Sequence, residues 1–286
     1  MKLVLGRDDL ATAAESAVRA TGTPVERLAV RPVHKASRGF VNESAVDVCE
    51  LAVVTLLQAV AHGLPVLLLP VTPLGRHQHQ TLVTLGALTA GDVGGRSVGV
   101  RSWSQTTGVW VRGFLTEEYG VDPRAVDWRT YEDAHVEGAK DPDWVTRAPE
   151  GARLQADFLD GRLDFGIMGN ELPDDDRIRT AIPDAQAAAA AWAARKGFVP
   201  VNHVVGVTEA AAREHSAAVL AAYDAMAAVP GPADLSPVGF AALRGPVGQA
   251  AAYALEQEVL PRAVGFDELV ERSCAALGVP PSRLGG

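Results

Sequence analysis

Short apolar runs rich in valine and leucine alternate with helix-like stretches along most of the chain. The run "AVDV" precedes "LAVVTLLQAVA", and "SVGV" precedes "TGVWVRGFLTEEY". Parallel strands need a crossover connection, usually a helix, so this alternation indicates βα units. The sequence therefore predicts an α/β protein with a largely parallel sheet.

Turn and cap residues mark the ends of several predicted elements. Gly63, Gly120 and Gly197 each follow a helix-like stretch, where glycine readily adopts the left-handed conformation that ends a helix. A turn at Gly161 precedes a predicted strand over residues 163–168. The run "FVPVNHVVGVT" predicts another strand, followed by one long helix over "TEAAAREHSAAVLAAYDAMAA" with Thr208 as its N-cap.

The size and charge of the chain limit the number of its domains and argue against nucleic acid and membranes as its partners. Its 286 residues are enough for one large domain or two lobes of about 100 to 150 residues each. A net charge of -9 argues against binding to nucleic acid or to an anionic membrane surface. The apolar stretches are shorter than the roughly 20 residues of a membrane span. The run "LVL" near Met1 is too short for a signal peptide, which predicts a cytoplasmic protein.

Cationic and titratable groups gather after the apolar run "PVLLLPV". Arg76, His77 and His79 lie within four residues, in a chain that is acidic overall. An arginine can hold a carboxylate with two hydrogen bonds, and a histidine exchanges a proton near neutral pH. We expect this segment to face an anionic small molecule; the alternatives are a solvated loop and a metal site. The segment has no Asp or Glu to complete a metal site, and only Cys49 and Cys274 are present as cysteines, so we predict no metal and no cofactor.

A polar turn follows the strand "SVGV". Its hydroxyls, together with the free N–H groups where a helix begins near residues 105–108, offer a binding site for a carboxylate or phosphate. The alternative is simple N-capping, which needs one hydroxyl only. Trp103 either stacks on a flat ligand or lies at an interface between lobes. The candidate residues of this turn are Ser102, Trp103, Ser104, Gln105, Thr106 and Thr107.

Three further polar residues stand beside or within apolar strands. Glu50 follows "AVDV" at the predicted start of the next helix, as a site residue or as an ordinary acid at a helix N-terminus. Asn202 and His203 interrupt an apolar strand, so His203 is either a satisfied core residue or a site residue. No dinucleotide-binding, Walker or nucleophile-elbow motif occurs where one would be expected, which argues against dinucleotide and phosphoryl-transfer chemistry.

From Ala45 onward the chain resembles the 4,5-dihydroxyphthalate decarboxylase family, cytoplasmic relatives of type 2 periplasmic solute-binding proteins. The strongest part is a strand, a polar turn and a helix over residues 98–123, with a Val-Trp-x-Arg-Gly pattern at Val109, Trp110, Arg112 and Gly113. A second anchor is "PVNHVV". The segment before Ala45 has no match in the family; Arg7, Asp8 and Asp9 are its candidate ligand contacts.

The resemblance implies a type 2 periplasmic-binding-protein-like fold, with two α/β lobes and a ligand cleft between them. One lobe would comprise residues 1–96 and 203–286, the other residues 97–202. The implied activity is cofactor-independent decarboxylation of a small, hydroxylated aromatic carboxylate. Two rival functions are binding of a small anion without catalysis, and dehydration or carbon–carbon cleavage on the same fold. The oligomeric state, including a homo-oligomer, stays open.

The resemblance also assigns roles at the cleft. A proton must reach the ring carbon that bears the carboxylate, and a base must draw density from a ring hydroxyl. His203 and either His77 or His79 would do this acid–base work, with Glu50 holding a hydroxyl or a histidine tautomer. The carboxylate would be bound by Arg76, Trp103, Gln105, Thr106, Thr107 and Asn202.

Overall fold

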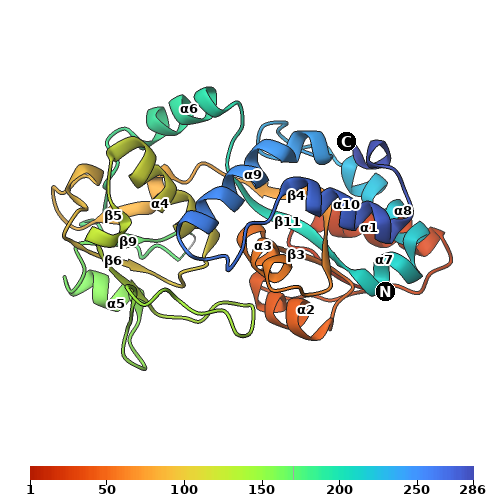
Figure 1. The fold of residues 1–286 in the computed structure, drawn as a ribbon, viewed down its shortest axis with the longest axis horizontal. Helices are drawn as coiled ribbons and strands as arrows, with labels where there is room; N and C mark the ends of the chain where they lie inside the picture. The colour runs from red at the N-terminus through yellow and green to blue at the C-terminus, as the bar shows by residue number, and fades with distance from the viewer. Residues whose placement is uncertain (170) are drawn as a thin grey trace.

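A computed structural model describes residues 1–169 and 171–286. The chain forms two sheets, each surrounded by helices, in an elongated molecule with both termini in the same half, on the right in Figure 1. The first sheet has the strand order β2-β1-β3-β11-β4. Its strands are β1 (Lys2–Val4), β2 (Glu26–Arg27), β3 (Val48–Ala52), β4 (Val66–Gly75) and β11 (Val201–Thr208).

The second sheet has the order β10-β5-β9-β6-β7-β8. Its strands are β5 (Leu82–Thr84), β6 (Ser97–Val100), β7 (Asp127–Thr130), β8 (Thr146–Arg147), β9 (Phe165–Ile167) and β10 (Arg179–Thr180). The predicted α/β architecture of two lobes is therefore confirmed.

The helices divide between the two sheets (Figure 1). Around the first sheet lie α1 (Asp8–Ala20), α2 (Ser37–Glu43), α3 (Val53–Ala61), α7 (Glu209–Glu214), α8 (Ser216–Ala227) and α10 (Phe266–Leu277). Around the second lie α4 (Thr106–Tyr119), α5 (Leu154–Leu159) and α6 (Ala185–Lys196). Helix α9 (Phe240–Glu256) runs between the two groups and packs on both α3 and α4.

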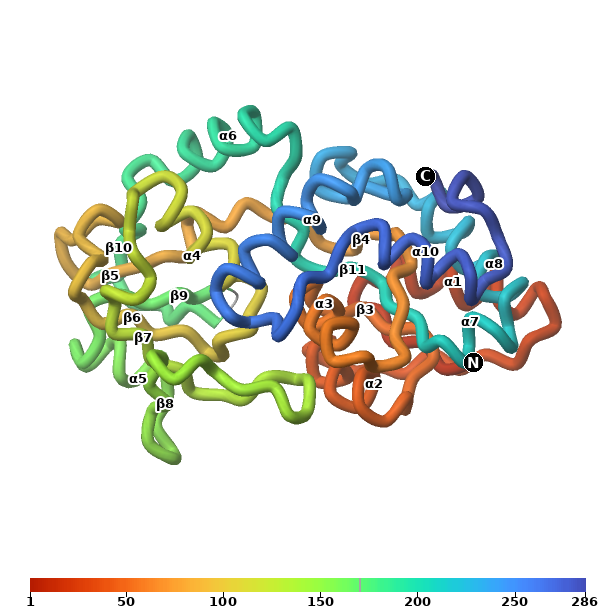
Figure 2. The backbone as a smooth tube through the Cα atoms, viewed as in Figure 1, coloured from red at the N-terminus to blue at the C-terminus, as the bar shows by residue number. Residues whose placement is uncertain are grey.

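Strand β11 departs from a purely parallel arrangement. It lies between β3 and β4 and is antiparallel to both, whereas β1 is parallel to β3. It is also the segment by which the chain returns from the second sheet to the first, after α6 (Figure 2). The prediction of a largely parallel sheet therefore missed an antiparallel return strand inside the first sheet, between β3 and β4.

The strands change from the first sheet to the second earlier in the chain than the predicted lobe boundary at residues 96 and 97. β4 ends at Gly75 in the first sheet, and β5 begins at Leu82 in the second. We propose that the first crossing lies between these two residues. The return crossing then falls just before Val201, close to the predicted boundary at residue 202.

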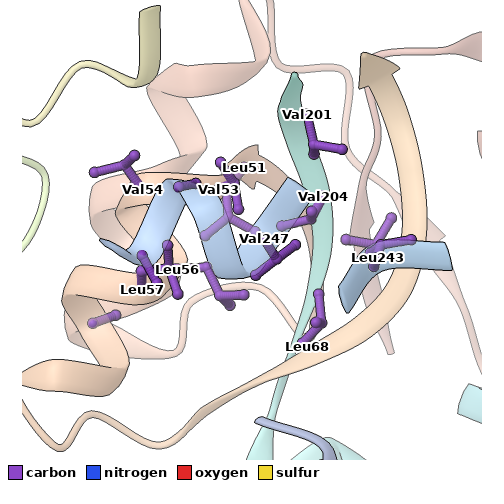
Figure 3. Close-up of a cluster of buried hydrophobic side chains, with 14 of the residues drawn as sticks. Leu51, Val53, Val54, Leu56, Leu57, Leu68, Val201, Val204, Leu243 and Val247 are labelled. Atoms are coloured by element: carbon purple, nitrogen blue, oxygen red, sulfur yellow. The ribbon is translucent and has the colours of Figure 1, made fainter. Parts of the chain in front are cut away.

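The core beneath α9 joins strands and helices of the first lobe (Figure 3). Leu243 and Val247 of α9 lie over the sheet beside Leu68 and Val204, and both α9 residues are fully buried. Burying a side chain of this size contributes about 1.5 to 3 kcal/mol. This packing fixes β11, and with it the polar residues that interrupt its apolar sequence.

Most predicted helix ends are confirmed. Gly63, Gly120 and Gly197 have positive φ angles of 75°, 64° and 78° at or just after the ends of their helices. Thr208 caps α7 by accepting a hydrogen bond from the Ala211 N–H. The prediction of one long helix after Thr208 was wrong, because the chain bends at His215, whose φ of -127° is not helical.

In the part of the chain that the structure describes, no helix is both long and apolar enough to cross a membrane.

Candidate functional site

A pocket of about 660 Å³ lies between the two lobes. Residues of the first lobe, such as Glu50 and His203, form part of its wall, and residues of the second lobe, such as Thr107 and Gly169, form another part. Its charged or titratable side chains are Arg31, His34, Glu50, Arg76, Arg101, Glu132, Asp133, His135, Glu171 and His203.

Glu50 and His203 form a hydrogen-bonded pair in this wall. Glu50 lies opposite Val205 in the β3–β11 ladder and His203 lies opposite Ala52, so the two side chains are diagonal neighbours on one face of the sheet. Glu50 Oε1 is 2.7 Å from His203 Nδ1, and Glu50 Oε2 accepts a hydrogen bond of 2.7 Å from the Gly6 N–H. In the tautomer that donates from Nδ1 to the Glu50 carboxylate, Nε2 is the nitrogen left for a ligand.

The structure corrects the expected position of Glu50. It lies within β3 and is 4% exposed, rather than at the start of the next helix. The strand extends to Ala52 because β11 pairs with it along residues 48–52, whereas β1 pairs only with Val48 and Cys49. The alternative of a solvated acid at a helix N-terminus is therefore excluded.

The polar turn, residues 102–107, leads into the start of α4 beside the pocket. The N-cap residue Gln105 makes no side-chain hydrogen bond to the helix, so simple N-capping does not explain the turn's hydroxyl groups. The Thr106 hydroxyl instead accepts a hydrogen bond of 3.2 Å from the Val54 N–H, in the first turn of α3. The positive ends of α3 and α4 thus meet at one side of the pocket, where they favour an anion.

Arg76 lies next to this turn. Its Nη2 donates to Thr107 Oγ1 at 3.4 Å and to Gln78 Oε1 at 3.3 Å. Burial lowers the pKa of Arg76, and the nearby Glu171 carboxylate opposes that shift. A guanidinium whose usual pKa is above 12 still carries its charge at neutral pH.

Gln105 and Asn202 also line the pocket, as predicted for ligand-binding residues. Gln105 Nε2 donates to Glu171 Oε1 at 3.2 Å, and Asn202 Oδ1 accepts from Gln78 Nε2 at 3.3 Å. Among the described residues, Gln105 Oε1 is buried without a hydrogen-bond partner. Both amides are therefore held by neighbouring polar groups at the edge of the pocket.

His77, His79 and Trp103 do not line the pocket, which corrects their predicted site roles. The strand ends at Gly75, and a 3-10 helix at His79–Thr81 turns the His79 ring into the core. Its centroid is 4.1 Å from that of the Phe114 ring, and its Nε2 is 3.2 Å from Glu118 Oε2. Burial lowers the pKa of His79, against the opposing effect of Glu118.

Of the two alternatives for Trp103, stacking on a ligand or packing at the interface between the lobes, the structure supports the second. It is 2% exposed, and its Nε1 donates to the Gln257 carbonyl oxygen at 2.9 Å. Its ring packs edge-on against Trp128 and Trp144. Residues 104–107 of the turn line the pocket, whereas the Trp103 indole packs into this aromatic cluster.

We expect His79→Gln to leave ligand binding and any chemistry in the pocket unchanged, because His79 lies in the core and not in the pocket wall. Loss of its stacking on Phe114 should lower the free energy of unfolding by about 1 kcal/mol. Turnover at saturating substrate and thermal unfolding of the variant measure both effects. A drop in turnover of tenfold or more, with the melting temperature unchanged, would restore His79 as a catalytic residue.

Two pocket histidines, His34 and His135, were missed from the sequence. They come from a 3-10 helix of the first lobe and a loop of the second, and their rings stack with centroids 6.3 Å apart. His34 Nε2 is 3.4 Å from Arg101 Nη1, and His135 Nδ1 is 3.2 Å from Thr55 Oγ1. Burial, followed by the charge of Arg101, lowers the pKa of His34 and brings that of His135 to about 4.

The loop that carries His135 is fastened to α2 of the first lobe. Arg38 Nη2 donates to the Ala134 carbonyl oxygen at 3.0 Å, and Asn42 Nδ2 donates to the His135 carbonyl oxygen at 2.9 Å. The Glu137 N–H donates to Asn42 Oδ1 at 3.0 Å. These hydrogen bonds connect the two lobes along one edge of the pocket.

Across residues 1–169 and 171–286, no group of three or more His, Cys, Asp or Glu side chains is arranged to hold a metal ion. Cys49 is fully buried, and burial raises the pKa of its thiol, so the group stays a protonated thiol at neutral pH.

Comparison with curated proteins gives two relatives with one name. A protein from Comamonas testosteroni is 32% identical over 185 residues, which cover 59% of this chain and 56% of the relative. One from Pseudomonas putida is 28% identical over 162 residues, which cover 51% of this chain and 62% of the relative. Both are 4,5-dihydroxyphthalate decarboxylases. The chain resembles 4,5-dihydroxyphthalate decarboxylases. It matches little more than half the length of these decarboxylase relatives, and no protein-family model matches it.

Solved structures agree on the fold. The ligand-binding component of an ABC-type import system from Staphylococcus aureus, with zinc bound, aligns over 99% of this chain and 96% of its own, with a TM-score of 0.54 and 9% identity. A Xanthomonas citri protein bound to ATP aligns over 91% and 98%, with a TM-score of 0.54 and 12% identity. The fold is that of periplasmic solute-binding proteins, with a sequence that resembles the decarboxylases.

Proposed function

We propose that the protein is a cofactor-independent decarboxylase of a small, hydroxylated aromatic carboxylate bound in the interlobe pocket. The observation that carries this proposal is the Glu50–His203 pair in the pocket wall. A buried carboxylate that orients a histidine is the usual arrangement of a general acid–base catalyst. The names of the relatives support the same reaction class.

The proposed reaction places a proton on the ring carbon that bears the carboxylate. His203 Nε2 accepts the proton of a ring hydroxyl, which raises the electron density at that carbon. The carbon then takes up a proton from the resulting imidazolium, the bond to the carboxylate breaks, and its electron pair restores the aromatic ring as CO2 leaves. Glu50 keeps the Nδ1 proton in place and stabilises the imidazolium formed between the two steps.

The carboxylate is proposed to lie where α3 and α4 begin, beside Arg76. There it would meet the N–H groups of the α4 start and the Arg76 guanidinium. His203 would then face the ring from the first lobe. Closing the two lobes around the ligand excludes water and strengthens each of these interactions.

Arg76→Lys is expected to raise KM about tenfold, because lysine keeps the charge but loses the planar pair of donors that matches a carboxylate. The turnover number should change less than KM, since the residue orients the acid and moves no proton. Steady-state kinetics on the acid with the highest rate of CO2 release measure this split. An unchanged KM would argue against a carboxylate at Arg76.

The deciding experiment measures CO2 release and product mass on a panel of hydroxylated phthalates and benzoates that includes 4,5-dihydroxyphthalate. Wild-type protein should release one CO2 per acid consumed, and His203→Gln should not; His79→Gln is the matched histidine control. The rival function, anion binding without chemistry, is favoured by the solute-binding fold. It would be supported if acids of the panel raise the melting temperature and none loses CO2.

A further inference from the structure

Arg112 is a buried cation that the proposed reaction does not use. It lies in α4 within the Val-Trp-x-Arg-Gly pattern and has no exposed surface. Burial lowers its pKa to about 9, which still leaves the guanidinium charged at neutral pH. Placing an ion in such surroundings is costly, and an apolar side chain of similar volume is often as stable or more so. The charge of Arg112 therefore calls for an explanation other than core packing.

The hydrogen-bond partners of Arg112 are neutral oxygen atoms. Its Nε donates to Gln257 Oε1 at 2.7 Å, and its Nη2 donates to the Trp103 carbonyl oxygen at 2.6 Å. Among the described residues, Nη1 has no hydrogen-bond partner. The guanidinium carbon lies 3.6 Å from the centroid of the Trp103 ring. The positive charge is thus held in place by neutral hydrogen-bond partners, and the Asp141 carboxylate acts on it only through space.

These contacts form a closed network behind the polar turn. Trp103 Nε1 donates to the Gln257 carbonyl oxygen at 2.9 Å, and Gln257 Nε2 donates to the Val109 carbonyl oxygen at 3.0 Å. Gln257 is the C-cap residue of α9. The network ties the end of α9 to the turn and to the first turns of α4, and the residues that follow Trp103 line the pocket.

We propose that Arg112 is a positioning residue for ligand binding: it holds the polar turn and adds a fixed positive charge behind the anion site without touching the ligand. The inference rests on the proposed function only in requiring an anionic ligand at the α4 start. In a low-dielectric interior, a cation without a hydrogen-bonded counter-ion acts at longer range than in water. It adds to the positive end of the α4 dipole, which is also directed at the pocket.

The test compares binding of 4,5-dihydroxyphthalate with binding of its neutral dimethyl ester, by calorimetry on the full chain. Arg112→Met should weaken binding of the diacid about tenfold or more, and binding of the ester by less than about twofold, because only the diacid interacts with the charge. Arg112→Lys should fall between Arg112→Met and wild type for the diacid. Tyr253→Phe, which removes a hydroxyl bonded to Glu117 in the same α4–α9 interface, is the matched control and should bind like wild type.

A second variant keeps the test decisive if Arg112→Met fails to fold. Gln257→Glu places a carboxylate at the Arg112 Nε, which neutralises the charge while leaving the arginine in place. We expect weaker binding of the diacid and unchanged binding of the ester. Equal binding of the diacid by Gln257→Glu and wild type, or an equal loss for diacid and ester in Arg112→Met, would overturn the proposal. Because binding is the readout, a wild-type protein that binds the diacid without releasing CO2 refutes decarboxylation alone.

Discussion

Replacing His203 with glutamine should lower the rate of CO2 release by about 10²- to 10⁴-fold, the usual contribution of a general acid–base group. Glutamine retains a polar side chain at the pocket wall but cannot carry a proton between a hydroxyl and a ring carbon. The dissociation constant of the acid should change by less than about threefold, because orientation is assigned to Arg76 and the polar turn. Single-turnover kinetics at saturating acid measure the loss directly.

Glu50→Gln tests the Glu50–His203 pair by changing the carboxylate in place of the histidine. The amide can present its NH2 group to His203 Nδ1 and so favour the tautomer with the proton on Nε2. The rate should fall about as far as in His203→Gln, and the double variant should lose little more than either single variant, since residues that act as a unit are not additive. Additive losses, or a His203→Gln enzyme that keeps its rate while His79→Gln loses it, would refute the assignment.

Acidification should destabilise the folded protein through His135. Its pKa is about 4 in the folded chain and about 6.5 when unfolded, so the unfolded chain binds more protons between these values. The free energy of unfolding is at its full value above pH 6.5 and falls as the pH drops toward 4, by on the order of 3 kcal/mol from this group. His34, whose pKa is also lowered by burial, acts in the same direction.

Urea unfolding at several pH values from 7 to 4.5, compared between wild type and His135→Asn, isolates this effect from the titration of carboxylates. Protonated His135 would face Arg101, Arg38 and the His34 ring, and its Nδ1 could no longer accept a hydrogen bond from the Thr55 hydroxyl. The wild-type free energy of unfolding should therefore decrease more steeply with falling pH than that of the variant. Parallel curves would show that His135 does not titrate in this window.

Local patterns in the sequence identified those pocket residues that stand out from their neighbours. His203 is detectable because it interrupts a run of valines in a strand, and a buried polar group in such a place needs a partner. Glu50 was found as a candidate although its strand extends beyond the predicted end. That extension depends on pairing with β11, which is far away in the sequence and lies outside any local pattern. Both are functional candidates because they violate the apolar pattern of their elements.

Residues in irregular segments could not be assigned in the same way. The histidines at 77 and 79 were expected on one face of a strand, but Gly75 ends that strand and the backbone turns into a 3-10 helix. His34 and His135 are separated by a hundred residues of sequence and belong to segments without periodicity, so only the docking of the two lobes brings their rings together. Which face of a turn meets solvent, ligand or core depends on such long-range contacts.

Strand β11 carries His203 and is also the path by which the chain comes back from the second sheet. A hinge motion that moves the lobes apart must bend the backbone next to His203, the residue proposed to transfer the proton. The same hinge motion would therefore open the pocket to a substrate and change the direction in which the His203 imidazole points. In the open form, the ligand could enter and leave while the His203 ring points away from it. The proposed chemistry would then occur only in the closed form, and no further conformational change would be needed to control it.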